Sequence, residues 1–226
     1  MVGPRAELWA DRLATAGLSR PLAVPDAETL SLDEAAHDLV VHALALHWSN
    51  DPVGQLIQLR RALKPDGLML AVLFGGDTLS ELRAVLAEAE VETLGGLSPR
   101  VAPMGEIRDL GGLLQRAGLA LPVADSRRID VSYGSALALM RDLRAMGETN
   151  VMVDRLRRPM PRAMLAQACA LYATRWGADG RVPATFEVVT LTGWAPGPGQ
   201  PQPLRPGSAA VRLADALEAA KEADEG

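Results

Sequence analysis

The stretch HDLVVHALALHWSND, residues 37–51, decides the fold class of this chain. Its apolar residues continue from Leu39 to Leu46 with little alternation, which is typical of a parallel strand covered on both faces. Asp51 and Pro52 then mark a helix start, because the aspartate can accept from free backbone amides and proline suits the first helical position. We therefore expect a central strand followed by a helix.

The segments that follow repeat this alternation. KPDG at 64–67 ends the predicted helix, and the apolar run LMLAVLF at 68–74 predicts a second buried strand. The glycine pair at 75–76 leads to TLSE at 78–81, which has the spacing of a capping box and predicts a helix to about Glu90. Strand, helix, strand and helix in this order predict an α/β protein with a mostly parallel sheet and right-handed crossovers.

Hydrophobic periodicity predicts the remaining elements. We expect helices at 6–16, 107–118, 139–147 and 162–176, and strands at 21–24, 119–131 and 184–194, the last at or near a sheet edge. A proline- and glycine-rich segment follows. The predicted organisation is one α/β domain over residues 1–197 and a linker with a C-terminal tail over 198–226.

Composition restricts the partners and the compartment. The formal charge of −5 and the absence of a basic run with interleaved aromatic residues argue against a nucleic-acid partner. The single cysteine, Cys169, excludes an internal disulfide framework and predicts a reducing compartment, with the cytoplasm as the default. Its place among alanines in a predicted helix favours a buried structural thiol over a nucleophile. The longest apolar runs are too short to span a bilayer, so we expect no membrane insertion.

Candidate ligand-binding residues lie just past the two clear strands, because open α/β sheets bind ligands beyond the carboxyl ends of their strands. His47 is either a ligand-facing or acid–base group or a strand-end histidine hydrogen-bonded to the backbone. Trp48 either stacks on a ligand ring or covers the core. The glycines at 75–76 either leave room for an anionic ligand near a helix N-terminus or form an ordinary turn.

Other polar residues leave similar alternatives open. Asp26 can accept from a ligand amino group or cap a turn. His37 and His42 precede His47 at intervals of five residues, which places the three on different faces, and no carboxylate or cysteine cluster accompanies them, so no metal site is expected. A partner-facing surface is one hypothesis for several charged residues, with a solvated helix face or a cap as the alternative; these are Asp77, Glu81, Arg100, Asp142 and Glu148.

Several of these segments together resemble the class I S-adenosylmethionine-dependent methyltransferases. The segments are VPDAETLSL at 24–32, HDLVVHALALHW at 37–48 and LKPDGLMLAVLFGG at 63–76. Further strings, among them FGGDTLSELR, GGLSPRVAP, MRDLRAMGETN and VPATFEVVTLTGW, resemble one branch of that family. It contains the methyltransferase-like assembly factor 5 of mitochondrial respiratory complex I and its bacterial relatives, with the malonyl-carrier-protein methyltransferase of biotin synthesis more distant.

The resemblance implies a fold, a cofactor and partners. The fold is Rossmann-like, with a mostly parallel sheet and a late antiparallel strand, and the cofactor is S-adenosylmethionine. By the same resemblance Asp26 approaches the adenine amino group, and Ala27, Leu46, His47 and Trp48 border the cofactor. The activity implied is methyl transfer to an unidentified acceptor. For the assembly-factor branch it is hydroxylation of an arginine on an iron–sulfur subunit of complex I. No catalytic base is indicated.

One departure from the family concerns the region before Asp26. The family's glycine-rich loop and its ribose-binding acid have no counterpart there, which predicts that the first strands of the sheet are missing. Each lost hydrogen bond to the cofactor is worth about 1–3 kcal/mol, so weak cofactor binding is expected. An exposed sheet edge invites pairing with another chain, so a homodimer is predicted, and a non-catalytic dimeric remnant is a third hypothesis.

Overall fold

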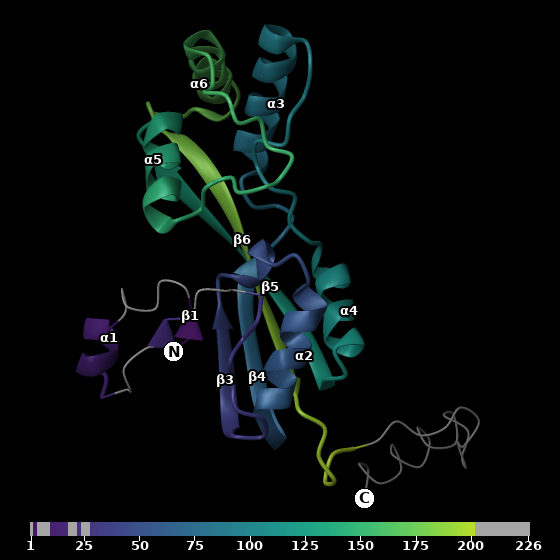
Figure 1. Ribbon diagram of the computed structural model, residues 1–226. Coiled ribbons are helices and arrows are strands. Elements are labelled where there is room, and N and C mark those ends of the chain that lie inside the picture. The colour runs from purple at the N-terminus through teal and green to yellow at the C-terminus, as the bar shows by residue number, and fades with distance from the viewer. Residues whose placement is uncertain (1, 4–9, 18–21, 24–27, 202–226) are drawn as a thin grey trace, which may run out of the picture. The chain divides into compact units, whose positions relative to one another are not determined.

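The computed structural model describes residues 2–3, 10–17, 22–23 and 28–201 (Figure 1). The chain divides into two compact units, residues 1–196 and 197–226, and the described helices and strands belong to the first. The helices are α1 (Ala10–Thr15), the short 3-10 helix η2 (Leu46–Trp48), α2 (Pro52–Ala62), α3 (Ser80–Leu94), α4 (Ile107–Arg116), α5 (Ala136–Met146) and α6 (Arg162–Trp176). The strands are β1 (Val2–Gly3), β2 (Leu22–Ala23), β3 (His37–Ala43), β4 (Leu63–Phe74), β5 (Ala120–Tyr133) and β6 (Val182–Trp194).

The main sheet has four described strands in the order β3-β4-β6-β5. β3 and β4 are parallel, and β6 runs antiparallel to both of its neighbours, β4 and β5. Three strands therefore share one direction and the last strand in sequence opposes them. This confirms the predicted open α/β sheet with a late antiparallel strand. β1 and β2 pair in parallel as a separate two-stranded sheet.

The strand that decided the fold class, β3, lies at the edge of this sheet. Among the described strands it pairs with β4 alone, and Leu39 and Val41 are 55% and 56% exposed, whereas Val40 packs against the core. The prediction of a central strand covered on both faces is therefore wrong. A continuous apolar run indicates a strand, but whether a second layer covers its other face depends on the rest of the fold.

Strand β4 begins five residues earlier than predicted. His37 pairs with Leu63 and Leu39 pairs with Leu68, so residues 64–67 form a bulge between two paired segments. Asp66 adopts a left-handed conformation there, with a φ of 63°. The KPDG segment is therefore absorbed into the strand as an irregularity. The helix before it does end there, at Ala62.

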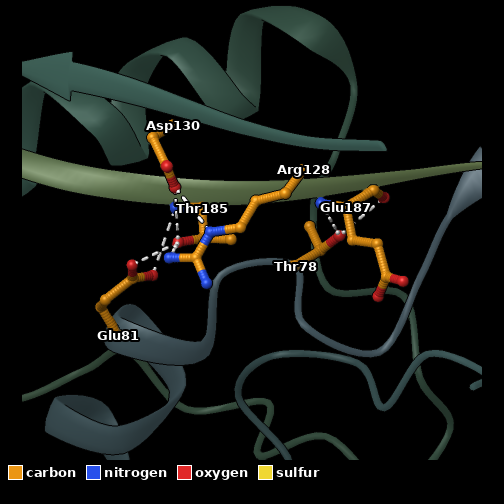
Figure 2. Close-up of polar contacts among 6 residues, drawn as sticks. All are labelled: Thr78, Glu81, Arg128, Asp130, Thr185 and Glu187. Carbon is orange, nitrogen blue, oxygen red and sulfur yellow. Dashed lines mark hydrogen bonds and ion pairs between the residues drawn. The ribbon is translucent and has the colours of Figure 1, made fainter. Parts of the chain in front are cut away.

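The predicted capping box at the start of α3 does not form. Leu79 is the N-cap residue, with φ of 55°, and no side chain caps the helix. The Thr78 hydroxyl instead accepts from the Glu187 amide of β6 at 3.0 Å. The Glu81 carboxylate accepts from the amide and hydroxyl of Thr185, also on β6, at 3.2 and 2.5 Å (Figure 2). Both side chains have the right spacing for a cap, but the neighbouring strand offers them buried partners.

Two apolar clusters cover the sheet. One joins α3, α5 and α6 to the part of β6 around Phe186, and the other joins α2 and α4 to β4 and the opposite part of β6. Cys169 on α6 is half-buried against the first cluster, and burial raises the pKa of its thiol. This environment fits the structural role predicted for the cysteine. Helices α4, α5 and α6 lie where periodicity predicted them, within two or three residues.

Candidate functional site

A hollow of about 250 Å³ lies beyond the carboxyl ends of β3 and β4. Residues from η2, from the start of α2, from the end of β4, from the 103–105 segment and from α4 surround it. Its apolar lining consists of Leu46, Pro52, Leu73, Pro103, Met104, Leu110 and Leu113, and its polar side chains are His47, Ser49 and Asp109. Ligand pockets commonly enclose about 300–1,000 Å³, so this hollow suits part of a nucleotide-sized ligand.

His47 has a buried polar side chain in this lining, with 3% of that side chain exposed. Its Nε2 lies 3.3 Å from Oε2 of Glu148, and its ring centre lies 5.2 Å from those of Trp48 and Phe74. Its Nδ1 is buried and has no hydrogen-bond partner among the described residues. An unpaired buried polar atom costs about 1–3 kcal/mol, so this nitrogen is suited to meet a ligand atom.

Glu28 fixes the turn that follows η2, a role that the sequence did not reveal. Its carboxylate accepts from the backbone and side-chain amides of Asn50 and from the hydroxyl of Ser49, at 2.9 to 3.0 Å. The Asn50 amide, with the Ser49 hydroxyl, holds the pKa of Glu28 below its ordinary value. The Gln58 side chain donates to the Glu28 carbonyl and accepts from the Leu30 amide. A contact between residues 21 positions apart leaves no local pattern in the sequence.

The predicted cofactor residues have different outcomes. Leu46 and His47 line the hollow, whereas the Trp48 ring lies beside His47 and is not part of the lining. Asp26 and Ala27 lie outside the described residues. His47 has the side chain of Glu148 as its partner, and no hydrogen bond from its ring to the backbone is found in the described part of the chain.

The glycine pair at 75–76 makes room for protein carboxylates. A Cβ atom on Gly75 would lie 2.6 Å from Oε2 of Glu187, and one on Gly76 would collide with the carboxylate of Glu106. Glu187 also accepts from the Asp77 amide at 3.0 Å. Two acidic side chains thus lie against these glycines, where one of the two predictions placed an anionic ligand. Their negative charges would repel such a ligand.

Most of the charged residues predicted to face a partner instead form hydrogen bonds or ion pairs with other residues of this chain. Glu81 is buried under Thr185, and Arg100 pairs with the buried Glu90 at 2.6 Å. Asp142 accepts from the Tyr133 hydroxyl at 2.8 Å, and Glu148 contacts His47. These four side chains therefore have intramolecular partners, although Asp142 is exposed, and Asp77 is exposed as well.

The buried Glu81 belongs to a polar network that joins α3 to β5 and β6 (Figure 2). Arg128 of β5 donates to the Thr185 hydroxyl at 3.0 Å and to the Asp130 carboxylate at 2.9 Å. The Asp130 carboxylate raises the pKa of Arg128, and Arg128 in turn lowers the pKa of Asp130. Every charged group of this network has a partner within the fold, so its role is structural.

Neither metal-binding nor membrane-spanning features occur among the described residues. No group of three or more histidine, cysteine, aspartate and glutamate side chains is placed to hold a metal ion there. Within the same residues, no helix has both the length and the apolar character needed to cross a bilayer.

Comparisons with known proteins identify the relatives of this chain. The profile of a methyltransferase domain matches residues 5–71. The protein named arginine-hydroxylase NDUFAF5, mitochondrial, of Danio rerio is 40% identical over 202 residues, which are 89% of this chain and 63% of that protein. Its Homo sapiens counterpart is 41% identical over 84% of this chain and 55% of its own length. The malonyl-[acyl-carrier protein] O-methyltransferase of Laribacter hongkongensis is 39% identical over 77% of this chain and 57% of its own length.

Solved structures share the fold at low sequence identity. A putative methyltransferase from Bacillus halodurans superposes with a TM-score of 0.51 at 15% identity, covering 86% of this chain and 81% of its own. The YcgJ protein of Bacillus subtilis gives a TM-score of 0.52 at 13% identity, covering 84% and 78%. The chain therefore has the Rossmann-like fold of the class I methyltransferases. Over most of its length the chain is similar to the proteins named arginine-hydroxylase NDUFAF5, and its first third matches a methyltransferase domain.

The chain spans between 41% and 63% of the length of the five relatives with the arginine-hydroxylase name. The predicted cytoplasmic location is contradicted, because these relatives are named as mitochondrial proteins. A low cysteine count indicates only that disulfides are not used, and it does not distinguish one reducing compartment from another.

Proposed function

We propose that the hollow beside His47 binds part of S-adenosylmethionine, and that this chain is the cofactor-binding region of a methyltransferase-like protein. The observation that carries the proposal is the unpartnered, buried Nδ1 of His47 at the carboxyl end of the sheet. Ligands of open α/β sheets bind at this edge. The fold relatives and the matching methyltransferase domain support the same cofactor.

The lining of the hollow suits this cofactor in two respects. The apolar side chains of Leu46, Leu110 and Leu113 offer a dry surface for an aromatic base or an alkyl chain. Glu148 contacts Nε2 of the His47 imidazole, which restrains the ring and leaves Nδ1 available for a ligand atom. Asp26, Ala27 and Trp48 complete the proposed cofactor site.

The cofactor, when bound, supplies an electrophilic methyl group. The residues of this chain then have the tasks of orienting it and excluding water from one side. Glu28 contributes indirectly, because it fixes Ser49 of the lining and the neighbouring Asn50.

Calorimetry and thermal melting with S-adenosylmethionine test this proposal. A ligand that binds only the folded state raises its melting temperature, so we expect measurable heat and a higher midpoint at millimolar cofactor. A His47→Gln variant should bind more weakly, whereas His37→Gln at the start of β3, outside the lining, should not. The absence of both heat and a melting shift in the unaltered chain would refute the proposal.

A second candidate function is arginine hydroxylation. It is favoured by the 40% identity over 89% of this chain to a protein named arginine-hydroxylase. The substrate would be an arginine side chain on an iron–sulfur subunit of respiratory complex I, and an oxygen-donating oxidant would convert a C–H bond to C–OH. Mass spectrometry of co-purified subunits tests it: a peptide heavier by one oxygen atom is expected only when this chain is expressed.

We also propose self-association through β3, and a domain at 1–197 followed by a tail at 198–226. The edge of β3 and the exposed side chains of Leu39 and Val41 support pairing with a second copy. Sedimentation should show a dimer that dissociates in Leu39→Lys and Val41→Lys, with Val153→Lys, exposed elsewhere, as the control. A monomer in the unaltered chain would contradict this part of the proposal.

A further inference from the structure

A second hollow, of about 430 Å³, shares no lining residue with the one beside His47. Three arginines line it, Arg100, Arg155 and Arg157, together with Asn150 and the apolar side chains of Leu86 and Met160. No acidic side chain is part of the lining. Its volume lies within the range of small-ligand pockets.

The wall of this hollow is built from segments far apart in the sequence. Glu90 of α3, with 2% of its side chain exposed, accepts from the Arg100 guanidinium at 2.6 Å and from the Ser98 amide and hydroxyl at 3.0 and 2.6 Å. The Asn150 side chain donates to the carbonyls of Pro99 and Arg100, at 2.7 and 3.2 Å. The segment 98–100 is thereby fixed between α3 and Asn150, so the hollow is preorganised.

The charges in the lining are not balanced. Glu90 compensates Arg100, but Nε of Arg100 is buried and has no hydrogen-bond partner among the described residues. Arg155 donates to the carbonyls of Val151 and Met152. Neither Arg155 nor Arg157 forms an ion pair with a described residue. Two cations and one buried donor therefore lie in the lining without an acidic partner.

We propose that this hollow binds a small organic anion, namely a carboxylate or phosphate on a short apolar chain. Guanidinium groups match both head groups because they donate two parallel hydrogen bonds in one plane. The head group lies against Arg155 and Arg157, and the chain lies against Leu86 and Met160. This site is independent of the S-adenosylmethionine proposal, since binding here requires neither methyl transfer nor the other hollow.

Calorimetry and thermal melting of the full chain with three probes test the site. The probes are hexanoate, hexyl phosphate and the neutral hexanamide, each at millimolar concentration. At least one anion should bind and raise the melting temperature, while the amide should not, and the stronger anion identifies the head group. Absence of binding by both anions, or equal binding by the amide, would overturn the proposal.

A matched pair of variants locates the site. Arg157 is exposed and has no intramolecular partner among the described residues, so Arg157→Gln should fold normally and raise the Kd of the anion about tenfold or more. Arg158 is its exposed neighbour and does not line the hollow, so Arg158→Gln should change the Kd less than twofold. Equal weakening by both variants would indicate a general charge effect and would contradict the assigned location.

Discussion

Helix α3 carries two buried carboxylates, Glu81 and Glu90. The partner of Glu81 is an uncharged threonine, whereas Glu90 is paired with an arginine. Glu81 accepts from the amide and hydroxyl of Thr185 and ties the helix to β6. Glu90 accepts from Arg100 and Ser98 and ties the same helix to the segment that forms the wall of the arginine-lined hollow. Two buried carboxylates on one helix therefore have different roles. Glu81 joins the helix to the sheet, whereas Glu90 stabilises the wall of a hollow, and the difference follows from their partners.

Removal of Glu90 is the change with the largest expected effect. Glu90→Ala leaves the Arg100 cation buried without a counter-charge, and the free energy of unfolding should fall by about 3–5 kcal/mol in urea denaturation. The exposed Glu34→Ala is the control and should change it by less than about 0.5 kcal/mol. If the double variant Glu90→Leu with Arg100→Leu loses as much as Glu90→Ala alone, the ion pair is not the cause.

Thr185→Val tests the other carboxylate with a nearly isosteric change. It removes the hydroxyl that donates to Glu81 at 2.5 Å and accepts from Arg128. A hydrogen bond to a charged group is worth about 1.5–3 kcal/mol, so a loss of this size is expected from urea denaturation. Thr190→Val on the same strand, with no hydrogen bond from its side chain to Glu81, is the control; equal losses would contradict the role of the network.

Acid should weaken the contribution of Glu90 to stability. Burial alone would raise the pKa of Glu90, but hydrogen bonds from Arg100 and Ser98 lower it to about 2 from an ordinary 4.5. Since the folded pKa is depressed, Glu90 contributes stability above pH 4.5 and loses it as the pH falls toward 2, by about 1.4 kcal/mol per pH unit. Unfolding of the unaltered chain and of Glu90→Gln between pH 6 and 3 should therefore converge. If the two curves of stability against pH stay parallel, the lowered pKa of Glu90 is contradicted.

Asp130→Asn should have the smallest effect. Asp130 pairs with Arg128 at 2.9 Å, but both side chains are 61% exposed, where water and salt weaken the attraction. We expect the midpoint of urea unfolding to stay within error of the unaltered chain. A shift comparable to that of Thr185→Val would show that the network depends on its exposed members as much as on Glu81.

Local sequence was sufficient for elements whose determinants are local. The Asp51 side chain accepts from the Gly54 amide at 2.8 Å and caps α2, as the Asp-Pro pair predicted. The bounds of α6 were also predicted from periodicity. The capping box failed because Thr78 and Glu81 found partners on β6, more than 100 residues away, and no spacing rule detects such a partner.

The candidate site follows the same division. The position of Leu46 and His47 at the end of a strand was predictable, because strand ends of open sheets define the ligand edge. His47 and Glu148 are 101 positions apart in the sequence. Glu28 and Ser49, whose side chains are hydrogen-bonded, are 21 positions apart. Neither pairing leaves a local pattern, so both were missed.

The α/β class, the alternation of strand and helix, and the likeness to the methyltransferases could be predicted from local patterns, because hydrophobic period and turn chemistry act over a few residues. Three features emerge only in the folded domain: β3 lies at an edge of the described sheet, the glycines at 75–76 face carboxylates, and arginines from two segments line one hollow. These features depend on which distant groups fill the remaining space and satisfy buried charges, and that is settled only when the whole domain packs.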